Sequence, residues 1–195
     1  QPGITKWNLA RFAETLLPLI DKNKDKAIGI ATETINKFDK IFNKNWLEMM
    51  KKKLGLFGEQ KEDEKLIGDL LSQMHKNKAD YTNTFCSLMN LGIHKDKMFD
   101  SKEFIDWQKK WKKRITKNNP PPKESLNLMH ASNPLLIPRN HKVEEALEAA
   151  NNDDLTPMKN LLKFLEKPYE NQEGISDYQY PAPISEKKYQ TFCGT

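Results

Sequence analysis

The sequence is poor in glycine and cysteine and has no long apolar run. Among its 195 residues are only 8 Gly, and they form no dinucleotide-binding loop, no P-loop and no Gly-x-Ser-x-Gly turn. These local signatures of nucleotide-binding and hydrolase folds are therefore absent. No segment approaches the roughly twenty apolar residues that a membrane-spanning helix requires. The two Cys are too few for a disulfide framework and favour a reducing compartment.

Charged and polar residues dominate what is present. Charged residues make up 30% and hydrophobic residues 37%, and the net charge of +5 is spread as mixed signs along the sequence. This pattern favours solubility over nucleic-acid binding, so we expect neither a nucleic acid nor a membrane as a partner. Alternating β-branched residues are scarce, which predicts an all-α fold. The first residue is Gln within an apparent helix, so we expect the chain to be a fragment of a longer protein.

Apolar residues recur at helical spacing along most of the chain. We expect Pro18 to kink or end the first helix and residues 43–45 to interrupt the second. Asp100 is a suitable N-cap, and Glu103 stands where a capping box requires it. Thr156 is expected to cap the last helix. The predicted helices cover residues 9–20, 28–42, 46–54, 66–74, 81–89, 100–115, 139–150 and 156–168.

Proline punctuates the second half and suggests the domain limits. The run Asn-Asn-Pro-Pro-Pro at 118–122 is the best internal boundary. We expect a helical part over 1–117, a Pro-rich linker over 118–134, a helical pair over 135–168 and an extended tail over 169–195.

Residues 21–33 (DKNKDKAIGIATE) superficially resemble a calcium loop. Asp21, Asn23 and Asp25 alternate like the first three ligands of an EF-hand. However, Lys26 stands at the sixth position, which needs Gly, and Thr32 stands at the twelfth, which needs Glu. A charged turn between two helices is the better interpretation.

The segment 104–115 (FIDWQKKWKKRI) is basic and amphipathic. It has two interpretations. In one, Trp107 and Trp111 pack in the core and the basic residues face water, as in an ordinary globular helix. In the other, the helix binds an anionic partner and the chain is a non-enzymatic interaction module. The basic residues are Lys109, Lys110, Lys112, Lys113 and Arg114.

No metal-ligating or nucleophilic constellation stands out. The four His residues lie far apart, so no metal site is predicted. Cys86 falls on an apolar helical face and is expected to be buried. Cys193, third from the C-terminus, is an exposed redox candidate or an idle terminal residue. The His residues are His75, His94, His130 and His141.

Five segments together resemble one known family, the selenoprotein O family of protein kinase-like adenylyltransferases. The resemblance runs over nearly the whole chain and is strongest in its C-terminal third. The segments are QPGITKWNLAR at 1–11, ADYTNTFCSL at 79–88, NPLLIPRNHKVEEALEAANNDD at 133–154, LLKFLEKPY at 161–169 and YPAP at 180–183.

The resemblance implies a parent protein that binds ATP and magnesium and transfers AMP to Ser, Thr or Tyr hydroxyls of proteins. The family's catalytic and ATP-binding residues lie upstream, so none maps onto this chain. The chain would be the helical C-terminal part of the kinase-like lobe with a C-terminal extension. It would bind no cofactor and be inactive alone, and its partners would be the upstream catalytic part and the parent's protein substrates.

The resemblance also bears on individual residues and on the compartment. Cys193 matches a family Cys or selenocysteine that, in bacterial members, pairs with a cysteine near the activation loop, although the ending Cys193-Gly194-Thr195 differs from the commoner Cys-Ser-Ser. Arg139 and Asn140 match a motif to which we assign a structural role, with Arg139 pairing a carboxylate or capping carbonyls. Bacterial members are cytoplasmic and eukaryotic ones mitochondrial, and the composition favours a bacterial, cytoplasmic protein.

Overall fold

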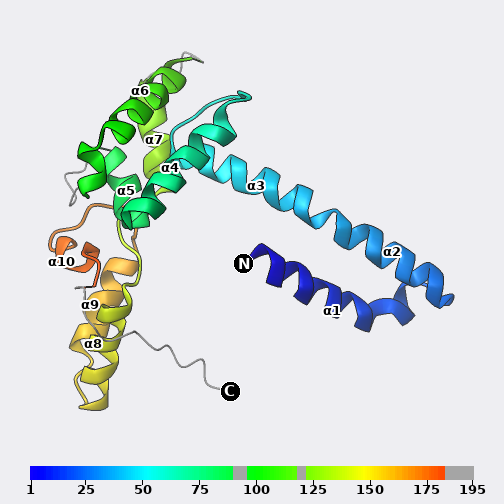
Figure 1. The fold of residues 1–195 in the computed structure, drawn as a ribbon. Helices are drawn as coiled ribbons and strands as arrows, with labels where there is room; N and C mark the ends of the chain where they lie inside the picture. Colours follow the sequence, from blue (N-terminus) through cyan, green and yellow to red (C-terminus); the bar gives the residue numbers. More distant parts are fainter. Residues whose placement is uncertain (90–95, 118–121, 183–195) are drawn as a thin grey trace. The chain divides into compact units, whose positions relative to one another are not determined.

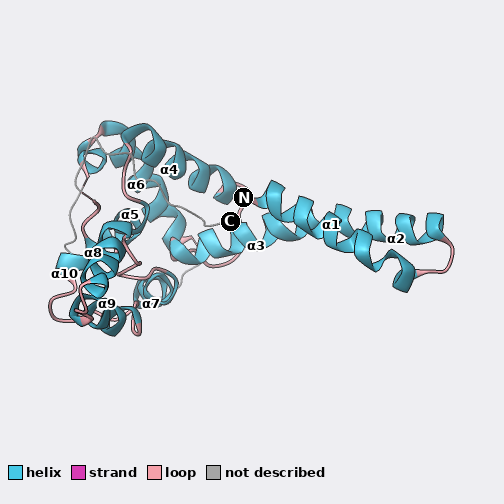
Figure 2. Ribbon diagram, turned by 90° about the horizontal axis from the view of Figure 1, so that it is seen from below, coloured by secondary structure: helices cyan, strands magenta, loops and turns pink. Residues whose placement is uncertain are grey.

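The computed structural model describes residues 1–89, 96–117 and 122–182 (Figure 1). Within these ranges every regular element is a helix and no strand occurs, which confirms the all-α prediction (Figure 2). The chain forms two compact units, Gln1–Met50 and Lys51–Thr195. Their boundary lies within a helix. Among the described helices, none has the length and apolar character needed to span a bilayer.

The first unit is built from α1 (Pro2–Ile20), α2 (Lys24–Asn36) and most of α3 (Phe38–Lys53). Helices α1 and α2 pack against each other along their length (Figure 1). Pro18 lies inside α1, which continues for two more residues to Ile20, so the missing N–H of proline does not end the helix at residue 18 itself.

The break between α2 and α3 falls at Lys37 and not at residues 43–45, which lie inside α3. The Lys37 amide donates to the Thr34 carbonyl at 3.2 Å. This bond spans three residues and closes a tighter turn than the four-residue bond of an α-helix, and α2 ends there. Asparagine has only a modest helical penalty, so its presence at 43 and 45 does not interrupt α3.

The second unit begins with α4 (Asp63–Asn77), α5 (Tyr81–Leu88), the 3-10 helix η1 (Lys97–Asp100) and α6 (Lys102–Thr116). Helix α6 packs on α4 and on η1. Its apolar face supplies much of the core, which includes Phe104, Trp107 and Trp111. Other large, fully buried hydrophobic side chains of this unit are Phe85, Leu54, Ile67, Leu70, Met98 and Leu136.

The N-cap of α6 is Ser101 and not Asp100. The Ser101 hydroxyl accepts from the Phe104 amide at 3.2 Å, whereas Asp100 belongs to η1. Asp100 was the wrong choice because the 3-10 turn before the helix takes up one more residue than the sequence pattern suggested.

Residues 122–132, expected within a Pro-rich linker, instead form helix α7 (Pro122–Ser132). Pro122 stands in the first turn, where a missing N–H leaves no bond unmade. The turn after α3 packs closely against α7. Gly55 has a φ of +68°, and a Cβ there would lie 2.8 Å from the Ser125 carbonyl oxygen in α7.

The chain ends with α8 (Asn140–Asn151), α9 (Thr156–Leu165) and the short α10 (Ser176–Gln179). Helices α8 and α9 pack together. Thr156 is the first residue of α9 and not its cap; the Asp154 carboxylate accepts from its amide at 2.9 Å. Helix α10 corrects the expectation of a wholly extended tail from 169 onward.

Candidate functional site

Arg139 lies at the N-terminal end of α8, and a hydrogen-bonded segment leads into it. The amides of Leu135 and Leu136 both donate to the Pro168 carbonyl, at 2.7 and 3.3 Å, and both side chains are buried. Arg139 itself has extended backbone angles, which a residue between Pro138 and a helix readily adopts. The segment therefore fixes the position from which the guanidinium projects.

The Arg139 guanidinium is the centre of a polar cluster. Its Nη1 and Nη2 donate to the two carboxylate oxygens of Asp80, at 2.7 and 3.0 Å. Nη2 also donates to Asn83 Oδ1 at 3.1 Å and to the Gln179 carbonyl at 2.9 Å. The Arg139 side chain is only 10% exposed, so these are partly desolvated, charge-assisted hydrogen bonds. The contacts are of the kind proposed for Arg139, a carboxylate and a carbonyl.

Asp80 does two tasks with one carboxylate. Besides pairing with Arg139, it is the N-cap of α5 and accepts from the Asn83 amide at 2.8 Å. Burial by itself raises the pKa of the Asp80 carboxyl, but hydrogen bonds from Arg139 and from the amides of Asn83 and Thr82 together hold it below its ordinary value. Asp80 thus stays ionised at neutral pH and keeps the guanidinium paired.

Gln179 of α10 ties the tail to the same cluster. Its side chain is buried, and the side-chain amide donates to the Leu135 carbonyl at 2.8 Å. The backbone carbonyl of Gln179 accepts from Asn83 Nδ2 at 3.1 Å and from Arg139 at 2.9 Å. One residue of α10 therefore connects α5, the segment before α8 and the chain beyond α9.

A second cluster surrounds Lys53 at the end of α3. Its ammonium donates to the Ser132 carbonyl at 3.3 Å and to Asn133 Oδ1 at 3.0 Å, and it lies over the rings of Tyr81 and Phe85 at 5.5 and 4.9 Å. Burial lowers the pKa of this ammonium. A cavity of about 240 Å³ adjoins it. The contacts of Lys53 are with neutral groups, which suits a packing role.

Of the two cysteines, the structure describes Cys86 but not Cys193. Cys86 is buried as expected, its thiol donates to the Pro134 carbonyl at 3.4 Å, and burial raises its pKa to about 11. Such a thiol is a poor nucleophile at neutral pH. Cys193 lies outside the described residues, so its redox role stays a prediction. Asn140 is the first residue of α8, directly beside Arg139.

The basic segment 104–115 lies in α6 and has its aromatic residues inside. The indole N–H of Trp107 donates to the Leu66 carbonyl at 2.8 Å, and that of Trp111 to the Leu54 carbonyl at 2.9 Å. This confirms the packed interpretation of both tryptophans.

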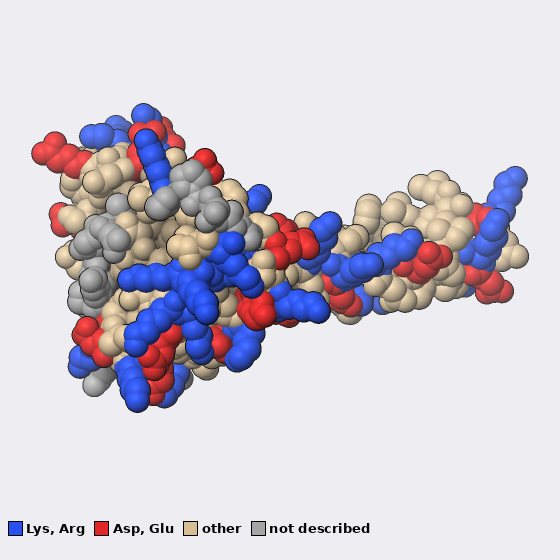
Figure 3. Space-filling model, turned by 90° about the horizontal axis from the view of Figure 1, so that it is seen from above, with Lys and Arg blue, Asp and Glu red and all other residues tan. Residues whose placement is uncertain are grey.

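Arg114 was expected on the solvent-facing basic side of this helix, but its side chain is buried and pairs with Asp63 of α4 at 2.5 and 2.9 Å. The other basic residues of the segment, Lys109, Lys110, Lys112 and Lys113, are exposed, and Lys and Arg gather on the face of the second unit seen in Figure 3.

The calcium-like stretch is a capping turn. Asn23 accepts from the Lys26 amide and begins α2, while Asp21 accepts from the Asn23 amide and pairs with the Lys26 ammonium at 2.7 Å. These carboxylate and amide oxygens are thus occupied locally, as the charged-turn interpretation requires. In the part of the chain that the structure describes, no three His, Cys, Asp or Glu residues lie close enough to hold a metal ion.

Comparison with known proteins then decides the family. Residues 1–166 match the family model described as "Protein adenylyltransferase SelO". The chain belongs to the SelO family. Similar proteins named "Protein nucleotidyltransferase YdiU" are 52% identical to this chain in Pelagibacter ubique, 47% in Alcanivorax borkumensis and 46% in Clostridium perfringens. Each alignment covers 100% of this chain but 40% of the relative, so the chain spans two fifths of the length of these relatives.

Sequence reasoning identified Arg139 but missed most of its partners. Asp80 carries a local signal, because an Asp three residues before Asn83 in a helical pattern is a typical N-cap. Gln179 and the buried pair of Arg114 with Asp63 carry none that a single sequence displays. Long-range pairing of polar side chains depends on how helices pack, which periodicity does not encode.

Proposed function

We propose that this chain is the C-terminal helical part of a SelO-type protein adenylyltransferase. The observation that carries the proposal is the family match over residues 1–166, together with relatives named as nucleotidyltransferases. In the proposed reaction a Ser, Thr or Tyr hydroxyl of a substrate protein attacks the α-phosphorus of ATP. The bond to the β-phosphate breaks, AMP stays on the hydroxyl oxygen and pyrophosphate leaves.

The catalytic work is assigned to the part of the protein that this chain does not span. We place there the groups that bind ATP and magnesium, since phosphoryl-type transfers rely on positioning and on neutralising charge at the phosphates. The role of residues 1–195 is then structural and regulatory: an all-helical part of a kinase-like lobe. The polar cluster of Arg139, Asp80, Asn83 and Gln179 supports this role, because its side-chain hydrogen bonds connect α5, the start of α8 and α10.

The test compares this chain with a longer protein that also carries the remaining three fifths found in relatives. Each is incubated with magnesium, an acceptor protein, and ATP labelled at either the α- or the γ-phosphate. We expect label from α-ATP only, with the longer protein only. Label from γ-ATP would identify a kinase and overturn the proposed chemistry. Label with residues 1–195 alone would show that the active site was placed wrongly.

Cys193 enters the proposal as a redox control point. In it, Cys193 forms a disulfide with a cysteine outside this chain, with two electrons passing to a thiol oxidant such as glutathione disulfide. AMP transfer by the longer protein should then rise on adding a reductant, and Cys193→Ser should remove that response. Unchanged activity of the wild type with and without reductant would contradict this part alone.

The alternative function, a binding module that uses segment 104–115, has less support in the structure. Both of its tryptophans are buried and hydrogen-bonded in the core, so only the exposed lysines remain available for a partner. Clustered lysines are an ordinary feature of a solvated helix surface.

A further inference from the structure

The unit Gln1–Met50 leaves many of its apolar side chains uncovered. Helix α1 has no buried residue, and the buried side chains of the described unit are Ala27 and Met50. An apolar surface of this extent on a helical pair is typical of an interaction face. Its large exposed side chains include Ile4, Trp7, Phe12, Leu19, Ile28 and Ile41.

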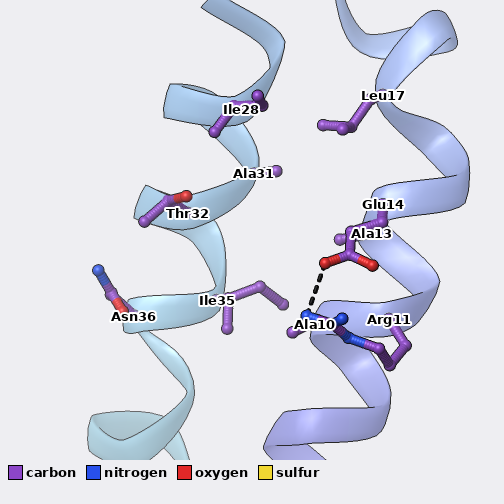
Figure 4. Close-up of a pocket in the computed structure, with 10 residues that line it drawn as sticks. All are labelled: Ala10, Arg11, Ala13, Glu14, Leu17, Ile28, Ala31, Thr32, Ile35 and Asn36. Atoms are coloured by element: carbon purple, nitrogen blue, oxygen red, sulfur yellow. Dashed lines mark ion pairs between the residues drawn. The ribbon is translucent and has the colours of Figure 1, made fainter. Parts of the chain in front are cut away.

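Helices α1 and α2 enclose an apolar groove of about 510 Å³ on this unit. Each end of the groove has at least one Leu or Ile side chain, and alanines line its middle. The ion pair of Arg11 with Glu14, at 2.6 Å, lies on its rim. Figure 4 shows Leu17 and Ile28 at one end, Ala13 and Ala31 in the middle, and Ile35 and Ala10 at the other. The rim carries one charge of each sign, already paired, so the groove favours an apolar occupant over a charged one.

We propose that this groove receives apolar side chains from the part of the same protein that its relatives possess and this chain does not span. The relatives align with all of this chain but over only 40% of their own length, so a longer stretch of polypeptide is available to fill it. A covalently attached segment has an effective concentration of about millimolar, which suffices for a modest apolar contact. Insertion of helical apolar side chains into such a groove is a common mode of recognition.

This inference rests on the proposed function in one respect, that the chain is part of a longer transferase. Its test uses a matched pair on α2. Ile28 and Ile30 are 41% and 43% exposed, but only Ile28 lines the groove. Ile28→Asp and Ile30→Asp therefore add the same charge to the same helix, one inside the groove and one outside it.

The measurement is amide hydrogen exchange over α1 and α2, in the longer protein and in residues 1–195 alone. In the longer protein we expect Ile28→Asp to speed exchange by about tenfold or more relative to Ile30→Asp, because a carboxylate in a filled apolar groove expels its occupant. In residues 1–195 the two variants should exchange alike. Equal exchange in the longer protein would overturn the proposal, and so would a difference already present in residues 1–195, which would mean that this chain or a second copy fills the groove.

A second variant guards against a fold damaged by charge. Ala31→Leu keeps an apolar helix former and fills the middle of the groove. It should leave exchange in residues 1–195 unchanged or slower, and it should speed exchange in the longer protein. Slower exchange in both proteins would overturn the proposal. AMP transfer is measured separately, so loss of the groove contact and loss of the proposed chemistry remain distinguishable.

Discussion

Arg139 and Asp80 lie 59 residues apart in the sequence, yet two guanidinium nitrogens of Arg139 contact both carboxylate oxygens of Asp80, at 2.7 and 3.0 Å. The same carboxylate caps α5. One side chain thus joins the start of α5 to the start of α8. A change at either residue affects a local helix end and a long-range connection together.

Arg139→Ala should lower the free energy of unfolding of residues 1–195 by about 2 kcal/mol, because several charge-assisted hydrogen bonds are lost in a partly desolvated place. The melting temperature should fall by about 4 to 8 °C. Urea and thermal unfolding followed by helical circular dichroism measure both quantities.

Lys167→Ala provides the control, because its pair with Glu170 is exposed on both sides. That variant should change the free energy of unfolding by about 0.5 kcal/mol or less. If Arg139→Ala were as mild as Lys167→Ala, the structural role assigned to Arg139 would be refuted.

Asp80 should make stability depend on acid pH. Its folded pKa lies below the ordinary 3.8, so the stabilisation is fully present above the ordinary pKa and is lost as pH falls through the lower folded value. We expect the free energy of unfolding to drop between about pH 5 and about pH 2, and to drop less steeply in Asp80→Asn. Urea unfolding at a series of pH values measures this, and identical slopes in the two proteins would contradict it.

Asp63→Asn tests the other buried ion pair. The side chains of Asp63 and Arg114 are 2% and 7% exposed, so the substitution leaves a guanidinium charge buried without its carboxylate. A loss of about 3 to 5 kcal/mol is expected. Asp69→Asn, at an exposed pair with Lys65, should be close to neutral and serves as the control in the same urea titration.

Cys86 should resist alkylation in the folded protein. With a pKa of about 11, only about one thiol in a thousand is ionised at pH 8, and the side chain is fully buried. In a Cys193→Ala background, iodoacetamide should therefore modify Cys86 in urea but leave it largely unmodified in buffer. Mass spectrometry measures the two extents, and rapid modification in buffer would show that the pocket around Cys86 opens.

The exposed lysines of α6 separate the two functional proposals. Replacing Lys109, Lys110, Lys112 and Lys113 with Gln should leave the fold intact, because all four side chains are exposed. AMP transfer by the longer protein should not change. Salt-sensitive binding of residues 1–195 to anionic vesicles or nucleic acid, abolished by this variant, would instead favour the interaction module.

Helix content and the main core were predictable from the sequence, because both follow from local periodicity. The packed interpretation of the stripe that contains Trp107 and Trp111 is confirmed by their burial, and the apolar face around Cys86 predicted that its side chain is buried. Helix α7 was missed because Pro-Pro-Pro at 120–122 suggested a linker, although proline is tolerated at a helix start.

The polar connections were harder to predict. Arg139 stood out only through the motif around it, and its pairing with Asp80 depends on the packing of α5 against the segment before α8. Arg114 was assigned to the basic face because its neighbours in sequence are lysines, whereas its position on the helix turns it inward toward Asp63. Helical spacing places a residue on a face but does not reveal which partner waits there.

Gly55 limits which substitutions this protein can accept during evolution. The Ser125 carbonyl lies 2.8 Å from where a Cβ would be, and φ is +68°, so no other residue fits without moving α7. Gly3, Gly29 and Gly68 meet nothing within 4 Å. Substitutions should therefore accumulate at those three positions during evolution but be eliminated at Gly55. Sequences that descend from this one should keep glycine at 55, and with it the contact between this turn and α7.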